Sequence, residues 1–158
     1  MERKSWRTYL IWIAVCEAVG IFAGFLSRAG AEIYGMTAVK PPLSPPAWLF
    51  PVVWTVLYAI MGIGAARVTL APVSPERSKG LNLMVAQLVV NFFWPLLFFN
   101  AQAYGFAFIW LLLLWVLVLW MILTFYKVDK TAALLQVPYL IWLTFAVYLN
   151  GAVWVLNS

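Results

Sequence analysis

Apolar and polar positions divide the chain into five long apolar runs separated by four short breaks. The runs lie at about residues 6–27, 46–69, 80–99, 103–126 and 131–156. Each has roughly the 20 residues that a helix needs to cross the hydrocarbon core of a bilayer. The runs are continuously apolar rather than alternating, which excludes a transmembrane β-barrel. The sequence therefore predicts an all-α integral membrane protein, a bundle of five transmembrane helices forming one domain over residues 1–158.

The composition agrees with a lipid environment and narrows the possible chemistry. Of the 158 residues, 66% are apolar and 9% are charged, a balance that no water-soluble domain of this size can hide in its core. The chain contains no histidine, the commonest ligand for zinc, copper and haem iron, and we therefore expect no metal site and no obligatory cofactor. It also has no carboxylate pair, no nucleophile beside a base and no Gly-rich phosphate loop. The residues that hydrolysis, phosphoryl transfer and ordinary acid–base catalysis require are therefore missing from the sequence.

The distribution of the ten basic residues predicts the orientation in the membrane. They lie in the gaps between the apolar runs rather than in one dense patch, which argues against nucleic acid as a partner. Eight of them share the side of the N-terminus: Arg3, Lys4, Arg7, Arg67, Arg77, Lys79, Lys127 and Lys130. This bias predicts an N-terminus inside and a C-terminus outside. The first run is too long for a signal peptide and is interrupted by Glu17, so we expect an uncleaved span. The compact loops favour a bacterial cytoplasmic membrane.

The first break, residues 28–45, ends in a proline-rich stretch that leads into the second run. Ser44 is a candidate N-cap and Pro45 a candidate first helical residue, which would deliver the chain into the second span at a fixed angle. Trp48 would then lie near the headgroup level, as an interfacial anchor or as part of a site. Pro138 should bend or loosen the fifth span.

Three runs each carry a face that mixes aromatic with small or amide side chains at helical spacing. These faces are Trp54, Tyr58, Met61 and Ala65; Gln87, Asn91, Trp94 and Phe98; and Tyr139, Trp142, Ala146 and Asn150. Amides in hydrocarbon need partners, so these faces should point into the bundle. Two interpretations remain open: the amides join the helices and the aromatics fill the core, or together they line a pocket for a flat, apolar ligand.

Three stretches resemble the signature of the translocator protein family, also called tryptophan-rich sensory proteins or peripheral-type benzodiazepine receptors (TspO/MBR). They are residues 40–58 (KPPLSPPAWLFPVVWTVLY), residues 87–94 (QLVVNFFW) and residues 137–142 (VPYLIW), the last followed by Leu149 and Asn150. The resemblance implies a five-helix bundle, often a homodimer, that binds tetrapyrroles such as protoporphyrin IX, cholesterol or drug-like molecules in a cavity closed by the first loop. It implies a sensory or regulatory membrane protein that binds porphyrins; the alternatives are a transporter of porphyrin or another lipophilic metabolite, and a slow light-dependent porphyrin oxidase.

The resemblance also assigns roles to individual residues. Trp54 and Trp142 resemble the paired tryptophans implicated in light-dependent porphyrin breakdown. Asn91 and Trp94 resemble pocket residues, and Ala146 resembles a small position whose enlargement alters ligand binding. The ligand-binding set expected overall is Tyr34, Trp48, Trp54, Tyr58, Gln87, Asn91, Trp94, Tyr139, Trp142, Ala146 and Asn150, of which Tyr34 and Trp48 resemble contacts from the first loop.

This chain departs from the family pattern at two places. Leu43 stands where many members have a tryptophan, so one aromatic wall of the site is expected to be missing. Gly151 and Val155 replace the tyrosine and arginine of the proposed cholesterol motif, which puts cholesterol recognition through that motif in doubt. Gly20 and Gly24 form a GxxxG pattern that permits close helix approach, either within the chain or between two copies.

Overall fold

The computed structural model describes residues 2–158, with side chains from residue 5 onward. The helices are α1 (Glu2–Thr37), α2 (Leu49–Thr69), α3 (Pro75–Pro95) with a π-helical turn η1 (Leu96–Asn100), α4 (Tyr104–Tyr126), α5 (Lys130–Leu135) and α6 (Val137–Leu156). Five segments are long and apolar enough to cross a membrane, α3 continuing into η1 and α5 into α6. The predicted bundle of five spans is therefore confirmed.

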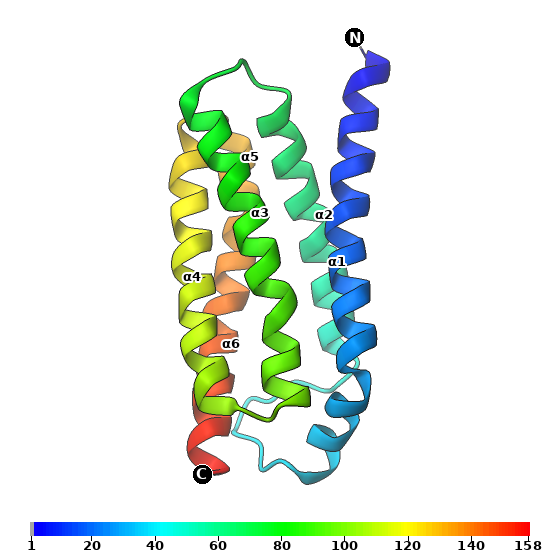
Figure 1. Ribbon diagram of the computed structural model, residues 1–158, viewed down its shortest axis with the longest axis vertical. Helices are drawn as coiled ribbons and strands as arrows, with labels where there is room; N and C mark the ends of the chain where they lie inside the picture. Colours follow the sequence, from blue (N-terminus) through cyan, green and yellow to red (C-terminus); the bar gives the residue numbers. More distant parts are fainter. Residues whose placement is uncertain (1) are drawn as a thin grey trace.

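Neighbouring spans run in opposite directions, as their short connections require (Figure 1). The largest contacts join α1 to α2, α3 to α4, and α4 to α6. The shared core lies among α2, α3, α4 and α6 and is formed largely by Met61, Met84, Leu111, Leu114, Met121, Phe125 and Leu143. The α2–α3 and α4–α5 connections lie at the same end as the start of α1 (Figure 1), so the basic residues of these connections gather at that end.

The first helix is longer than its apolar pattern predicts, because it runs to Thr37 and shortens the first loop to residues 38–48. Its extra turns pack against η1, where a Cβ on Gly30 would lie 2.6 Å from the Phe99 carbonyl carbon; just before these turns, the Asn100 side chain donates to the Leu26 carbonyl at 2.9 Å. Helix formation there depends on contacts 70 residues away along the chain. Tyr34, expected in the loop, therefore belongs to α1.

The predicted helix start at Ser44 and Pro45 is wrong, because α2 begins at Leu49 with Trp48 as its N-cap residue. Proline disfavours the α region for the residue before it, so Pro46 weakens a helix start at Pro45, although Phe50 is helical before Pro51. The Ser44 hydroxyl instead donates to the Pro41 carbonyl at 2.8 Å, which folds the loop on itself.

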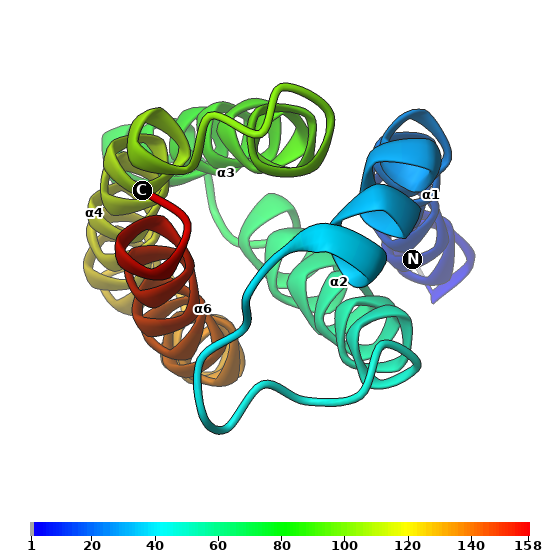
Figure 2. The same cartoon turned by 90° about the horizontal axis from the view of Figure 1, so that it is seen from below.

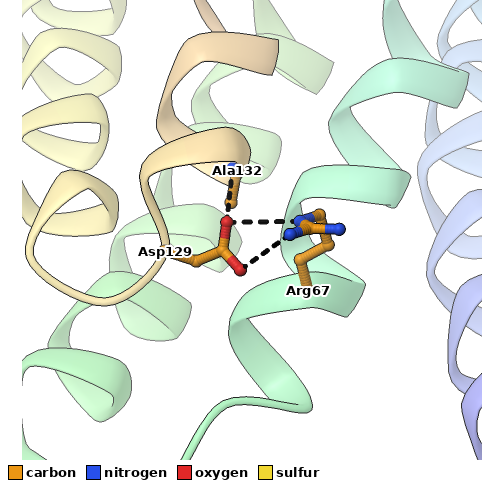
Figure 3. Close-up of polar contacts among 3 residues, drawn as sticks. All are labelled: Arg67, Asp129 and Ala132. Carbon is orange, nitrogen blue, oxygen red and sulfur yellow. Dashed lines mark hydrogen bonds and ion pairs between the residues drawn. The ribbon is translucent and has the colours of Figure 1, made fainter.

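The fifth span is interrupted at Gln136, between α5 and α6, two residues before Pro138, where the span was expected to bend or loosen. Asp129 is the N-cap of α5: its carboxylate accepts the Ala132 N–H at 2.9 Å and the Arg67 Nε–H at 3.2 Å, and Arg67 Nη2 forms an ion pair with its other oxygen at 3.2 Å (Figure 3). Partial burial raises the pKa of this carboxyl, but the Ala132 N–H and the Arg67 charge outweigh it and hold the pKa below its ordinary value of 3.8.

Of the two GxxxG glycines, only Gly20 is used within the chain. A Cβ at Gly20 would lie 2.6 Å from a ring carbon of Tyr58 on α2, so the missing side chain lets α1 and α2 approach closely. Gly24 has nothing within 4 Å of its Cβ position.

Candidate ligand-binding site

The three aromatic and amide faces point into the bundle, as their spacing predicts. Tyr58, Gln87, Asn91, Tyr139 and Asn150 are buried. Trp54, Trp94, Trp142 and Ala146 are half-buried and pack against the core. The residues that the sequence places on α2, α3 and α6 thus meet in one region of the molecule.

A continuous chain of hydrogen bonds joins the polar groups of these faces. The Tyr58 hydroxyl donates to Asn91 Oδ1 at 2.6 Å, Asn91 Nδ2 donates to the Tyr139 hydroxyl at 2.6 Å, and that hydroxyl donates to Gln87 Oε1 at 2.7 Å. Gln87 Nε2 lies 3.3 Å from the sulfur of Met61. Because every link crosses between helices, the chain ties α2, α3 and α6 together at the centre of the bundle.

A second polar cluster lies nearer the end of the bundle that holds the first loop. The Trp94 indole N–H donates to Asn150 Oδ1 at 3.0 Å, and Asn150 Nδ2 donates to the Tyr104 carbonyl at 2.9 Å. The Trp94 ring stacks on Phe98 with 5.0 Å between centroids. The three amides of these faces, Gln87, Asn91 and Asn150, therefore all have partners within the protein, the arrangement that interhelical hydrogen bonds in hydrocarbon require.

Trp54 and Trp142 differ from the other half-buried tryptophans in their indole N–H groups. Four half-buried indoles donate hydrogen bonds, those of Trp12, Trp94, Trp110 and Trp115. Within the described residues, neither Trp54 nor Trp142 has a partner for its N–H. Both indoles are half-buried and their nitrogens are not enclosed, so these two N–H groups are accessible from outside the bundle.

Aromatic rings surround these two tryptophans. Phe50 meets Trp142 edge to face at 5.9 Å, and Trp54 lies 5.5 Å from Tyr58 and 6.1 Å from Tyr139, measured between ring centroids. We call Phe50, Trp54, Tyr139 and Trp142 the aromatic wall. Its two halves belong to α2 and α6, which have few direct contacts with each other.

Two of the expected site residues lie apart from the wall. Tyr34 packs against Phe98 and Phe99 of η1 at 5.2 and 5.4 Å between centroids, beside the second polar cluster. Trp48 is 66% exposed at the start of α2. The structure therefore brings together nine of the eleven expected residues in two adjoining groups, places Tyr34 beside the second of them and leaves Trp48 outside.

The first loop crosses the end of the bundle between α2 and α6, as Figure 2 shows. The Asn157 side chain accepts the Val39 N–H at 2.9 Å and donates to the Val39 carbonyl at 2.8 Å, and the Tyr148 hydroxyl donates to the Pro42 carbonyl at 2.8 Å. We call these three bonds the loop clasp. Sequence reasoning missed both side chains, because their partners are backbone groups more than 100 positions away.

Comparison with known proteins agrees with this arrangement. The sequence pattern of the TspO/MBR family matches residues 12–155. The chain belongs to this family. It is 38% identical over 155 residues to the tryptophan-rich protein TspO of Chlorobaculum tepidum, covering 98% of each chain. It is 37% identical over 150 residues to protein CrtK of Rhodobacter capsulatus, covering 94% of this chain and 92% of the relative. Over 144 residues it is 36% identical to the human translocator protein, covering 89% and 85%.

Family membership and the five apolar helices together make this TspO/MBR member an integral, multi-pass membrane protein. Among the residues that the structure describes, no three cysteine, aspartate or glutamate side chains gather into a group that could hold a metal ion. The wall offers rings and two indole N–H groups, which suits recognition by stacking and hydrogen bonding rather than by coordination.

Proposed function

We propose that this protein binds porphyrins and other flat lipophilic molecules at the aromatic wall, under the first loop, and serves as a membrane sensor of such molecules. The observation that supports this most directly is the pair Trp54 and Trp142, half-buried on facing helices and without hydrogen-bond partners in the described chain. A planar macrocycle would stack on these rings, and the two N–H groups would donate to its carboxylates or carbonyls.

In this proposal the amides have a different task from the tryptophans. Asn91, Gln87 and Asn150 are satisfied by Tyr58, Tyr139, Trp94 and a backbone carbonyl, so they fix the spacing of α2, α3 and α6. A ligand would meet a rigid wall rather than a set of free amides. Preorganisation of this kind lowers the entropy lost on binding.

A sensory role is suggested by relatives as well as by the loop. A relative from Cereibacter sphaeroides, 32% identical over 146 residues, bears the name tryptophan-rich sensory protein. The loop clasp gives this chain an element that a ligand would displace or lock, and a changed loop is a signal that another protein could detect. In this proposal the ligand binds at the aromatic wall first, and the first loop changes its conformation afterwards.

Quenching of tryptophan fluorescence by protoporphyrin IX tests the proposal in detergent. We expect saturable quenching at low micromolar ligand and at least a tenfold weaker apparent affinity for Trp142→Leu. The matched control is Trp115→Leu, which removes another half-buried tryptophan, one on α4 whose N–H is bonded to Thr144. Its affinity should equal that of the unchanged protein.

Only variants with equal melting temperatures should be compared, because a loosened bundle would also weaken binding. Linear quenching that no variant alters would mean that porphyrin simply partitions into the detergent micelle. Equal weakening by Trp142→Leu and Trp115→Leu would place the ligand elsewhere. Either result contradicts binding at the aromatic wall.

A further inference from the structure

The first loop contains one residue in a backbone conformation that its side chain disfavours. Leu43 has a φ of +69°, in the left-handed region, and among the non-glycine residues that the structure describes only Gln102 also has a positive φ. An L residue adopts this region only against a steric penalty. The Leu43 side chain is 78% exposed, so its burial does not offset the penalty. Contacts of the neighbouring backbone must therefore hold Leu43 in this conformation.

The position of Leu43 between two pairs of prolines concentrates the freedom of the loop at this residue. The double prolines 41–42 and 45–46 have fixed φ angles, and each proline also disfavours the α region for the residue before it. Between positions 41 and 46, Leu43 is the only residue that is neither a proline nor directly before one. The peptide between Pro42 and Leu43 is therefore the part of this stretch that can rotate most easily.

Pro42 and Leu43 are the two central residues of a tight turn that leads from Pro41 to Ser44. A proline at the first central position and a positive φ at the second are the pattern of a type II turn, which favours glycine or asparagine where this chain has Leu43. A type I turn accepts the same proline but gives the second central residue a φ of about −90°, which suits leucine. Rotation of the single peptide between Pro42 and Leu43 converts one turn type into the other.

The Tyr148 hydroxyl holds this peptide in the orientation that Leu43 disfavours. It donates to the Pro42 carbonyl at 2.8 Å, across 106 positions of the sequence. This carbonyl belongs to the peptide whose rotation would relieve Leu43, and the rotation would turn its oxygen away from Tyr148. The hydrogen bond and the relaxed turn therefore exclude each other. The Ser44 hydroxyl, which donates to the Pro41 carbonyl at 2.8 Å, closes the turn without contacting the peptide that rotates.

We propose that the peptide between Pro42 and Leu43 is a two-state switch that clasps or releases the first loop. In the clasped state Tyr148 holds the Pro42 carbonyl, Leu43 is left-handed and the loop crosses the end of the bundle between α2 and α6 (Figure 2). In the released state the peptide is rotated, Leu43 has a negative φ, and only the bonds between Asn157 and Val39 remain of the loop clasp. A hydrogen bond and a left-handed leucine have free energies of similar size and opposite sign, so both states are populated.

Nuclear magnetic resonance of the isotope-labelled protein in detergent tests the switch, because the Cα and Cβ chemical shifts of Leu43 report the sign of its φ. We expect Tyr148→Phe to move these shifts to the values of a negative φ and to speed hydrogen exchange at the Val39 amide at least threefold. The matched control is Tyr126→Phe, because Tyr126 is 54% exposed at the opposite end of the bundle and Tyr148 is 42% exposed. The control should change neither measurement.

Glycine at position 43 tests the steric penalty itself. Leu43→Gly removes the penalty of the left-handed region, so the clasped state should gain and exchange at the Val39 amide should slow at least threefold. Leu43→Val should speed this exchange, because a β-branched residue tolerates a positive φ poorly. Ala47→Gly is the matched control in the same loop, at an exposed position without a positive φ, and should not slow exchange.

Combining the two changes separates the switch from a general loosening of the loop. Leu43→Gly should return exchange in the Tyr148→Phe variant to within about threefold of the unchanged protein, because the lost bond and the lost penalty offset each other. Leu43 shifts that Tyr148→Phe leaves unchanged would overturn the proposal, since the turn would then be left-handed without the hydroxyl. Faster exchange in Leu43→Gly would overturn it as well, since glycine would only add flexibility. All these measurements use the protein without ligand, so their failure would leave the porphyrin proposal unaffected.

Discussion

Replacing Tyr139 with phenylalanine tests whether the central hydrogen-bond chain holds the helices together. The change removes one oxygen and keeps the ring that packs against Trp54. Two bonds are lost, the one accepted from Asn91 at 2.6 Å and the one donated to Gln87 at 2.7 Å. Both amides are at most 3% exposed, so water cannot replace the hydroxyl without a structural change.

The expected loss follows from the number of groups left without a partner. A buried unpaired polar group destabilises a protein by about 1–3 kcal/mol, whereas hydrogen bonds between transmembrane helices average only about 0.6 kcal/mol because the unfolded helices find other partners. The membrane value is the relevant one for each of the two bonds, and it sets a lower limit of about 1 kcal/mol. Two unpaired groups at about 1–3 kcal/mol each set an upper range of about 2–6 kcal/mol, and we expect the loss to lie between these limits.

Tyr58→Phe is the matched control, because it removes a single bond, the one donated to Asn91 Oδ1. Unfolding of both variants by sodium dodecyl sulfate in mixed micelles, followed by circular dichroism, gives the two free energies. We expect Tyr139→Phe to lose about twice as much as Tyr58→Phe, since it breaks two interhelical bonds instead of one. A loss at position 139 equal to or smaller than that at position 58 would refute the reasoning, and so would full stability in both variants.

Three further predictions concern the ends of the bundle. Because the pKa of Asp129 is lowered, its ion pair and cap stabilise the fold above pH 4, and the contribution disappears as the pH falls through the lowered pKa. The stability difference between the protein and Asp129→Asn in a pH series of thermal melts should therefore shrink below pH 4; a constant difference would contradict it. Gln136 is fully buried, and neither atom of its amide has a partner among the described residues. Gln136→Met keeps the shape and should raise the free energy of unfolding by about 1 kcal/mol, whereas a loss would reveal a hidden partner. Asn157→Ala should speed hydrogen exchange at the Val39 amide at least tenfold, with little change at α4; unchanged exchange would mean that the clasp does not hold the loop.

The fold was largely predictable because hydrocarbon imposes strict local rules. Each span needs about 20 apolar residues, and that requirement alone locates all five. The errors lie at helix ends outside the apolar runs. The end of α1 depends on contacts with η1, as the bond from Asn100 to Leu26 shows, and no local pattern encodes a contact over 74 positions. The start of α2 was not predictable from Pro46 alone, because Phe50 is helical although Pro51 follows it.

The residues of the candidate site were predictable from the sequence. Which of them join the helices and which remain without a partner was not. Helical spacing brings Asn91, Tyr139 and Trp142 to the inner faces, and all three are buried or half-buried. Periodicity gives the direction of a side chain and not its partner. Only the three-dimensional arrangement shows that Asn91 bonds to two tyrosines while the Trp142 N–H has no partner in the described chain.

The different roles of the amides and the tryptophans determine how binding data from variants should be interpreted. Replacing Asn91 breaks two interhelical bonds at once, so any loss of porphyrin affinity would mix a damaged bundle with a lost contact. Trp142 makes no hydrogen bond in the described chain and packs through its ring, so its removal changes the wall more than the helix spacing. If the proposed site is correct, Trp142→Leu should lose affinity while keeping its melting temperature, and Asn91→Leu should lose both together. The reverse pattern would mean that the amide contacts the ligand directly and that the hydrogen-bond chain rearranges when the ligand binds.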